Sequence, residues 1–232
     1  MKRSILAVAL AAAPMLAPAA EFDVTIENPT RGIYYTPLLI AAHSSDQTLF
    51  TTGEAASSAL QAMAEGGDIS ALQSALDSAG ATIAANPAGG LLVPGASTTA
   101  TLNTDSAPSN TQLSVVAMLL PTNDGFLALN SLTIPTVPGT YTYDLNAYDA
   151  GTEANDEVRG SGAPGQPGMP VPPPLDPEAG TGGSGVPASA EGYVHIHRGN
   201  LGDTDATGGV SDIDSTLHRW LNPVARVTVT VK

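Results

Sequence analysis

The sequence predicts an all-β fold, an antiparallel β-sandwich of about eight strands with a short helical insertion. Short runs that alternate apolar and polar residues recur along the chain. Turn residues separate these runs, and the 232 residues include 24 Gly and 19 Pro. Helical spacing is confined to residues 53–80. We therefore expect one sandwich domain over residues 21–232, because this length suits a single core.

The strands follow from the period of two in side-chain direction. Residues 22–27 and 225–231 place apolar side chains on one face and polar ones on the other. Residues 113–120 form an apolar run interrupted only by Ser114, which is typical of a central strand covered on both faces. The eight expected strands cover residues 22–27, 38–42, 98–102, 113–120, 126–132, 141–148, 193–197 and 225–231.

Two segments depart from the strand pattern. In residues 53–80, apolar residues recur at helical spacing in two runs separated by Gly66 and Gly67, so we expect a helical pair that closes one end of the sandwich. Residues 160–192 are a Gly/Pro-rich loop, and more than half of residues 160–187 are Gly or Pro. We expect this loop to be extended and to bury little, because such a composition sustains neither a helix nor a ladder.

The first twenty residues are typical of a secretory signal peptide. Lys2 and Arg3 precede a short apolar stretch, and small residues follow near Ala19. The protein is therefore expected to be secreted or periplasmic. The chain has no cysteine, so the core or a bound metal must provide its stability. Its formal net charge of −14 argues against nucleic acid as a partner and allows contact with anionic membranes only through a cation.

An acidic loop follows the strand expected at residues 141–148. Asp149 and Glu153 flank Gly151, which lets the chain curl until both carboxylates face one point. Calcium takes six to eight oxygen ligands, and such a loop can supply several of them. The alternative is a simple turn in which the Asp side chain accepts a hydrogen bond from its own backbone.

Two other groups of residues could hold a metal ion. Asp203, Asp205 and Asp214 are spaced as in a helix-loop-helix calcium loop, but Asp214 replaces the usual bidentate Glu, so this is either a second cation loop or a flexible acidic loop. His195 and His197 share one face of a strand and can chelate zinc with a third ligand such as His43. No Gly-x-Ser-x-Gly nucleophile motif occurs.

An ordered series of short stretches resembles the spondin domain family, which comprises the N-terminal domain of the animal matrix proteins F-spondin and mindin and bacterial secreted relatives. No single stretch is diagnostic, but their order is. The matching stretches are residues 33–37, 43–46, 53–57, 123–126, 148–153 and 222–227.

The resemblance implies a β-sandwich similar to calcium-dependent membrane-targeting modules, with one divalent cation held by three acidic positions. Carried over residue by residue, these positions fall on Asp124, Asp149 and Glu153. The chain lacks the family's cysteines, and Gly125 stands where animal members carry Trp. The expected function is a secreted, non-enzymatic module that binds one Ca²⁺ and contacts an extracellular protein or glycan in adhesion. The alternative is a metal-dependent hydrolase that uses His43, His195 and His197.

Overall fold

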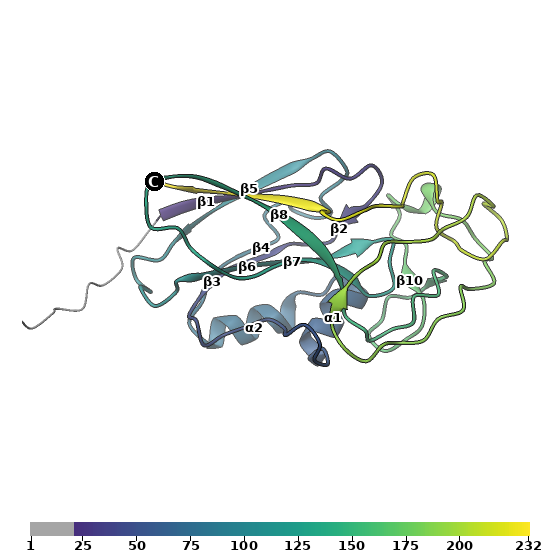
Figure 1. Ribbon diagram of the computed structural model, residues 1–232, viewed down its shortest axis with the longest axis horizontal. Coiled ribbons are helices and arrows are strands. Elements are labelled where there is room, and N and C mark those ends of the chain that lie inside the picture. The colour runs from purple at the N-terminus through teal and green to yellow at the C-terminus, as the bar shows by residue number, and fades with distance from the viewer. Residues whose placement is uncertain (1–20) are drawn as a thin grey trace, which may run out of the picture.

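The computed structural model describes residues 21–232, so the expected signal peptide lies outside the described residues. The fold is a mostly antiparallel sheet curled into a nearly closed sandwich (Figure 1), which confirms the all-β prediction. The strand order is β4-β3-β6-β7-β8-β12-β1-β5, with β11 (His195–Ile196) paired to β8 and β2 (Tyr34–Tyr35) paired to β6. The main strands are β1 (Glu21–Glu27), β3 (Leu39–His43), β4 (Thr82–Ala85), β5 (Ser97–Asn103), β6 (Gln112–Leu120), β7 (Gly125–Thr133), β8 (Gly139–Asp149) and β12 (Ala225–Val231).

The sandwich has one layer built around β1, β5 and β12 and a second built around β3, β6 and β7, and the long strand β8 passes between them. The two outer strands of this order, β4 and β5, lie against each other and nearly close the sheet. The main core fills the interior, where the alternating side chains of β1 and β12 meet those of β6. This alternation is confirmed: Phe22, Val24 and Ile26 are fully buried, as are Val227 and Val229.

The β6 strand is apolar on both faces, as expected, and each face contributes to a different core. Val115 and Leu119 point into the sandwich, whereas Val116 and Met118 point to the opposite side of the sheet. A second core therefore needs a cover on that side.

The helices provide this cover. Helices α1 (Ser58–Gly66) and α2 (Ser70–Ser78) lie across the outer face of β3, β6 and β7 (Figure 1), so the expectation that they close one end of the sandwich was wrong. Ser57 caps α1 through a hydrogen bond from the Leu60 N–H, and Gly67 ends the helix at φ 70°. No helix in residues 21–232 is long and apolar enough to cross a membrane.

The expected strands are present, with one that is much shorter than predicted. Of residues 193–197, only β11 (His195–Ile196) is a strand, and it pairs with the end of β8. The short strands β2 (Tyr34–Tyr35) and β4 were not expected, since neither is long enough to show a period of two clearly.

The Gly/Pro-rich segment is more structured than its composition suggested. Strands β9 (Arg159–Gly160) and β10 (Met169–Pro170) form a short parallel pair, and a 3₁₀ turn covers Asp176–Glu178. Met169 and Leu175 are fully buried, and Leu175 joins the helix-side core. The expectation that this loop buries little was therefore wrong.

Side-chain acceptors explain how a segment with so few ladder bonds is held in place. Glu65 and Glu153 accept hydrogen bonds from the backbone N–H groups of Gly165 and Gly168, respectively. The Asp212 carboxylate accepts from the Arg159 and Gly183 N–H groups at 2.9 and 2.8 Å. Backbone groups that cannot pair within a sheet thus find buried carboxylates instead.

Candidate metal centre

The candidate site lies where three strands meet at one end of the sandwich. Gly125 at the start of β7 pairs with Asp149 at the end of β8, and His195 of β11 pairs with the same Asp149 from the other side. Asp124 immediately precedes β7, and its carbonyl accepts the Ala150 N–H at 3.2 Å. The pairing therefore brings Asp124, Asp149 and His195 to one rim, although they are far apart in the sequence.

Asp124 is fully buried and only half satisfied. Its Oδ2 accepts hydrogen bonds from the N–H groups of Thr152 and Glu153 at 2.8 and 3.1 Å, so Asp124 organises the acidic loop. Its Oδ1 is buried and has no hydrogen-bond partner. Burial, followed by the nearby charge of Asp149, raises the pKa of Asp124 to about 7. A cation at Oδ1 would offset both effects.

Asp149 anchors the other side of the site. Its Oδ1 accepts the Gly151 N–H at 2.8 Å and its Oδ2 accepts the Asn155 amide at 2.7 Å, while the residue is 1% exposed. The turn-forming hydrogen bond considered as the simpler interpretation of this loop is therefore present. It leaves further lone pairs on both oxygens, because each carboxylate oxygen can accept more than one bond.

Gly151 lets the acidic loop lie directly against the segment that carries Tyr193. It adopts φ +67°, and a Cβ at this position would lie 2.3 Å from the Tyr193 carbonyl oxygen. The Gly151 carbonyl accepts the Gly192 N–H at 2.8 Å. The glycine expected to let the loop curl also permits this close approach between segments.

The Glu153 carboxylate is held on one side by partners outside the acidic loop and keeps its second oxygen free. Its Oε1 accepts hydrogen bonds from the Asn123 amide at 3.0 Å and from the Gly168 N–H, while its Oε2 is buried without a partner. Burial raises the pKa of Glu153, and the nearby charges of Glu65 and Asp156 add to this effect. Glu153 lies at the end of the loop that Asp124 organises. It also lines a pocket together with Glu65 and Asp156.

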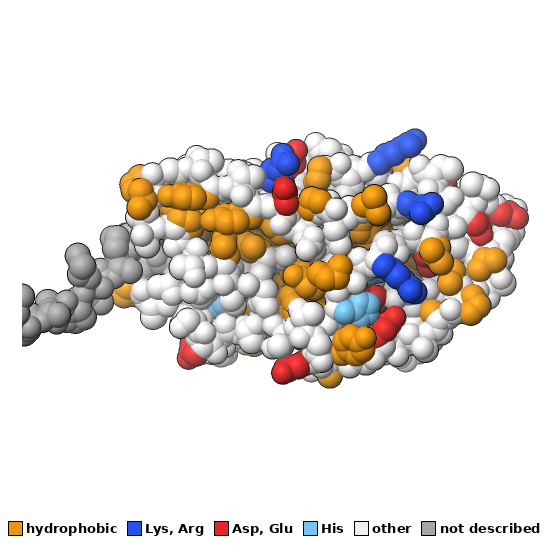
Figure 2. Space-filling view, viewed as in Figure 1, with side chains coloured by type: hydrophobic (Ala, Val, Ile, Leu, Met, Phe, Trp, Pro, Cys, Tyr) orange, Lys and Arg blue, Asp and Glu red, His pale blue; other side chains and the backbone are white. Residues whose placement is uncertain are grey.

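Among residues 21–232, Asp149, Glu191 and His195 form a group that can hold a metal ion. One ligand atom from each lies within 4.8 Å of the others. His195 Nε2 is 3.6 Å from Asp149 Oδ1 and 3.8 Å from Glu191 Oε2. Figure 2 shows a histidine side chain at the surface beside acidic side chains. Sequence reasoning missed Glu191, whose only signal was its place four residues before His195.

His197 lies behind this group and is 4% exposed. Burial lowers its pKa to about 4, although the charge of Asp149 opposes this shift. Its ring packs against Trp220 at a centroid distance of 5.1 Å, and its Cδ2 is so near Gly125 that a Cβ there would lie 3.0 Å away. The space that glycine leaves at position 125 is thus occupied by the His197 ring.

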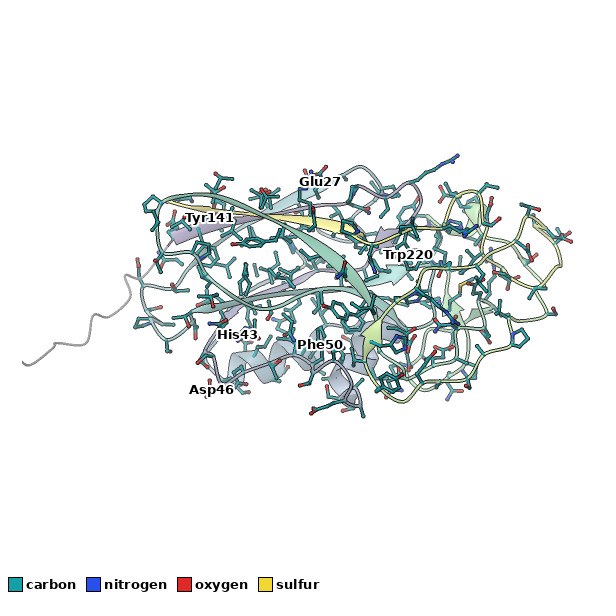
Figure 3. All side chains as sticks on the ribbon, viewed as in Figure 1. Glu27, His43, Asp46, Phe50, Tyr141 and Trp220 are labelled. Carbon is teal, nitrogen blue, oxygen red and sulfur yellow. The ribbon has the colours of Figure 1, made fainter. Side chains whose placement is uncertain are left out.

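His43 is far from the other two histidines, so the predicted zinc set of His43, His195 and His197 does not assemble. His43 pairs with Gln112, and Gln112 pairs with Thr133 at the far end of β7 from Gly125. The 9 residues of β7 span roughly 25–30 Å at about 3.3 Å per residue. Figure 3 shows the separation between His43 and Trp220, the residue that His197 contacts. His43 Nε2 instead lies 2.8 Å from the Ser114 hydroxyl.

The other acidic loop is held by its own backbone. Asp203 Oδ2 accepts the N–H groups of Val210 and Ser211 at 2.7 and 3.0 Å, and its Oδ1 accepts the Asp205 N–H at 2.9 Å. Asp214 Oδ1 accepts the Thr216 N–H at 2.7 Å. The bonds from Asp205 and Thr216 are those of Asx turns, and the bonds from Val210 and Ser211 close the loop onto the Asp203 carboxylate.

Comparisons with known proteins place the fold and the rim in one family. No curated protein matches the chain. The model of the Spondin_N family matches residues 25–171, which run from within β1 to the end of the β9–β10 pair and include Asp124, Asp149 and Glu153. Glu191, His195 and β12 lie beyond the matched residues. The match covers more than half of the chain and runs through the strands that build the rim, so this chain belongs to the spondin N-terminal domain family.

Proposed function

We propose that this protein is a secreted module that binds Ca²⁺ through Asp124, Asp149 and Glu153 and uses the loaded rim to contact an extracellular protein or glycan. Membership of the spondin N-terminal domain family supports an extracellular, non-enzymatic module. The proposals of calcium binding and of adhesion are argued from the residues at the rim.

The unpartnered Oδ1 of Asp124 carries the calcium proposal. An ionised carboxylate oxygen that is buried without a donor is unfavourable, and a second buried carboxylate beside it increases the penalty. A divalent cation between Asp124 and Asp149 removes this penalty, because its positive charge offsets the two carboxylates and gives Asp124 Oδ1 a partner. Glu153 adds a third carboxylate with a free oxygen, Oε2.

The chemistry of these ligands favours calcium over a softer metal. Asp124, Asp149 and Glu153 offer oxygen only, and the irregular loops around them can add backbone carbonyls, which suits the flexible coordination of Ca²⁺. A cation on this rim would also reduce the negative charge that otherwise repels acidic partners. Contact with a partner is therefore expected to depend on calcium.

The test compares thermal unfolding in EDTA and in excess CaCl₂ for the wild type, Asp124→Asn and the control Asp105→Asn, whose side chain is exposed. Calcium binding to the folded state alone stabilises it by about 2.7 kcal/mol at a hundredfold excess over Kd. We expect this shift in the wild type and in Asp105→Asn, and we expect Asp124→Asn to lose most of it. In EDTA, Asp124→Asn should unfold no earlier than the wild type, because it removes a buried charge. No calcium-dependent shift in the wild type would refute the proposal.

A further inference from the structure

The outer edge of the rim carries a group of side chains that the calcium proposal does not use. Glu191 and His195 lie on the segment that follows the Gly/Pro-rich loop, and both face Asp149. Their side chains are 27% and 26% exposed, whereas Asp149 is buried. We call Asp149, Glu191 and His195 the edge triad.

The hydrogen bonds of His195 determine which of its ring nitrogens is free. Its Nδ1 lies 3.0 Å from the Ile196 carbonyl oxygen, which can only accept a hydrogen bond. Nδ1 therefore carries the proton in the neutral ring, and Nε2 presents its lone pair. Metal-binding histidines commonly have this arrangement, in which the second ring nitrogen donates to a backbone carbonyl.

The lone pair of His195 faces two more acceptors. Nε2 lies 3.6 Å from Asp149 Oδ1 and 3.8 Å from Glu191 Oε2, and neither Nε2 nor Glu191 Oε2 has a hydrogen-bond partner. Three acceptor atoms that face one another without a shared hydrogen repel, unless a cation lies between them. That cation is either a second proton on His195 or a metal ion.

A buried histidine, His197, lies near the same carboxylate. His197 Nδ1 accepts the Gly199 N–H at 3.0 Å, so Nε2 of the neutral ring carries the hydrogen. This Nε2 is buried, has no hydrogen-bond partner and lies 3.9 Å from Asp149 Oδ2. His197 is therefore not a ligand of this group, because its lone pair is already engaged by the Gly199 N–H.

The donor set indicates the class of metal. Calcium prefers oxygen alone, whereas an imidazole nitrogen with two carboxylates suits Zn²⁺ and other divalent transition metals. Adjacent ligand atoms in a tetrahedral zinc site lie about 3.3–3.4 Å apart, given metal–ligand distances of about 2.0–2.1 Å. The two distances from His195 Nε2, 3.6 and 3.8 Å, are slightly longer, and the side chains of Glu191 and His195 are partly exposed.

We propose that the edge triad is a second cation site, which takes a divalent transition-metal ion of the Zn²⁺ class and shares Asp149 with the calcium site. Asp149 uses Oδ1 towards this ion. Three protein ligands leave one tetrahedral position open to solvent or to a donor group of a partner. The site goes beyond the calcium proposal, because Glu191 and His195 have no part in the latter.

Calorimetric titration of the EDTA-treated, dialysed protein with ZnCl₂ at pH 7 tests the site directly. The variants His195→Gln and Glu191→Gln each remove one ligand, and Glu54→Gln is the control because it removes an exposed carboxylate outside the triad. We expect one zinc ion to bind the wild type, a loss of affinity of at least tenfold in each ligand variant, and an unchanged affinity in Glu54→Gln. The calcium-induced shift in thermal midpoint should persist in His195→Gln and Glu191→Gln.

Long-range ¹H–¹⁵N spectra of the wild-type histidines provide a readout that needs no variant. Zinc should shift the Nε2 resonance of His195, while the resonances of His43 should stay in place. The proposal is overturned if zinc leaves His195 unchanged, if His195 is doubly protonated at pH 7 and binds no zinc, or if Glu54→Gln weakens zinc binding as much as the triad variants do. Zinc binding without any calcium response would support the edge triad and reject the calcium site, so the two proposals fail separately.

Discussion

Replacing Leu175 with Ala tests whether the Gly/Pro-rich segment is part of the core. In a loop that buries little, Leu175 would be exposed to solvent. In the structure it is 0% exposed and packs into the helix-side core. Truncation of a buried Leu to Ala lowers the free energy of unfolding by about 2–5 kcal/mol. This is a large part of the roughly 5–15 kcal/mol that stabilises a typical domain. We expect Leu175→Ala to fall within this range.

Leu221→Ala is the matched control, because it removes the same atoms from a side chain that is 86% exposed. Its effect should stay within about 0.5 kcal/mol. Urea denaturation followed by circular dichroism gives both values, and equal m-values would show that the two variants unfold from the same state. If Leu175→Ala is no less stable than Leu221→Ala, the segment does not contribute to the core. Deletion of residues 160–187 should likewise destabilise the protein strongly, since it also removes the buried Met169.

Two further predictions concern the rim and the response to pH. Gly151→Ala should lower the free energy of unfolding by more than the roughly 1–2 kcal/mol that a left-handed non-glycine residue costs, because its Cβ would meet the Tyr193 carbonyl. The control Gly80→Ala, at φ +79° with open space around it, should cost only that amount. Equal losses of stability in urea denaturation would contradict the close packing at Gly151. Burial lowers the pKa of His218, so its contribution to stability is present above about pH 6.5 and is lost as the pH falls below that value, by up to about 1.4 kcal/mol per pH unit. His218→Gln should therefore flatten the loss of stability between pH 7 and pH 5, and an unchanged slope would show that His218 does not titrate there.

Local patterns predicted the strands because burial on a sheet follows a period of two. The alternation in β1 and β12 and the two-faced burial of β6 could be predicted from their own residues. The two helices could be predicted from their apolar stripes, but their place could not. Only the tertiary structure shows that the two helices are what covers the outer face of β6.

The candidate site was predictable only in part. Asp124 and Asp149 precede and end strands that are neighbours in the chain, so their meeting at one rim follows from a simple hairpin order. Glu191 and His195 reach the same rim through β11, a strand of 2 residues that carries no periodic signal. Nothing in the sequence distinguishes His43 from the other histidines as a candidate ligand. The pairing of β3 with β6 places His43 at the other end of the sheet.

By itself, the sequence determined the fold class, the main strands and the family, because these depend on side-chain alternation and on short ordered stretches of residues. The tertiary structure alone decided the roles of the acidic residues. Glu65, Glu153 and Asp212 accept hydrogen bonds from backbone groups that are distant in the sequence, while Asp124 and Glu191 retain oxygens without a partner. A carboxylate in a sequence is only a charge, and its neighbours in space determine whether it binds water, a backbone N–H or a metal ion.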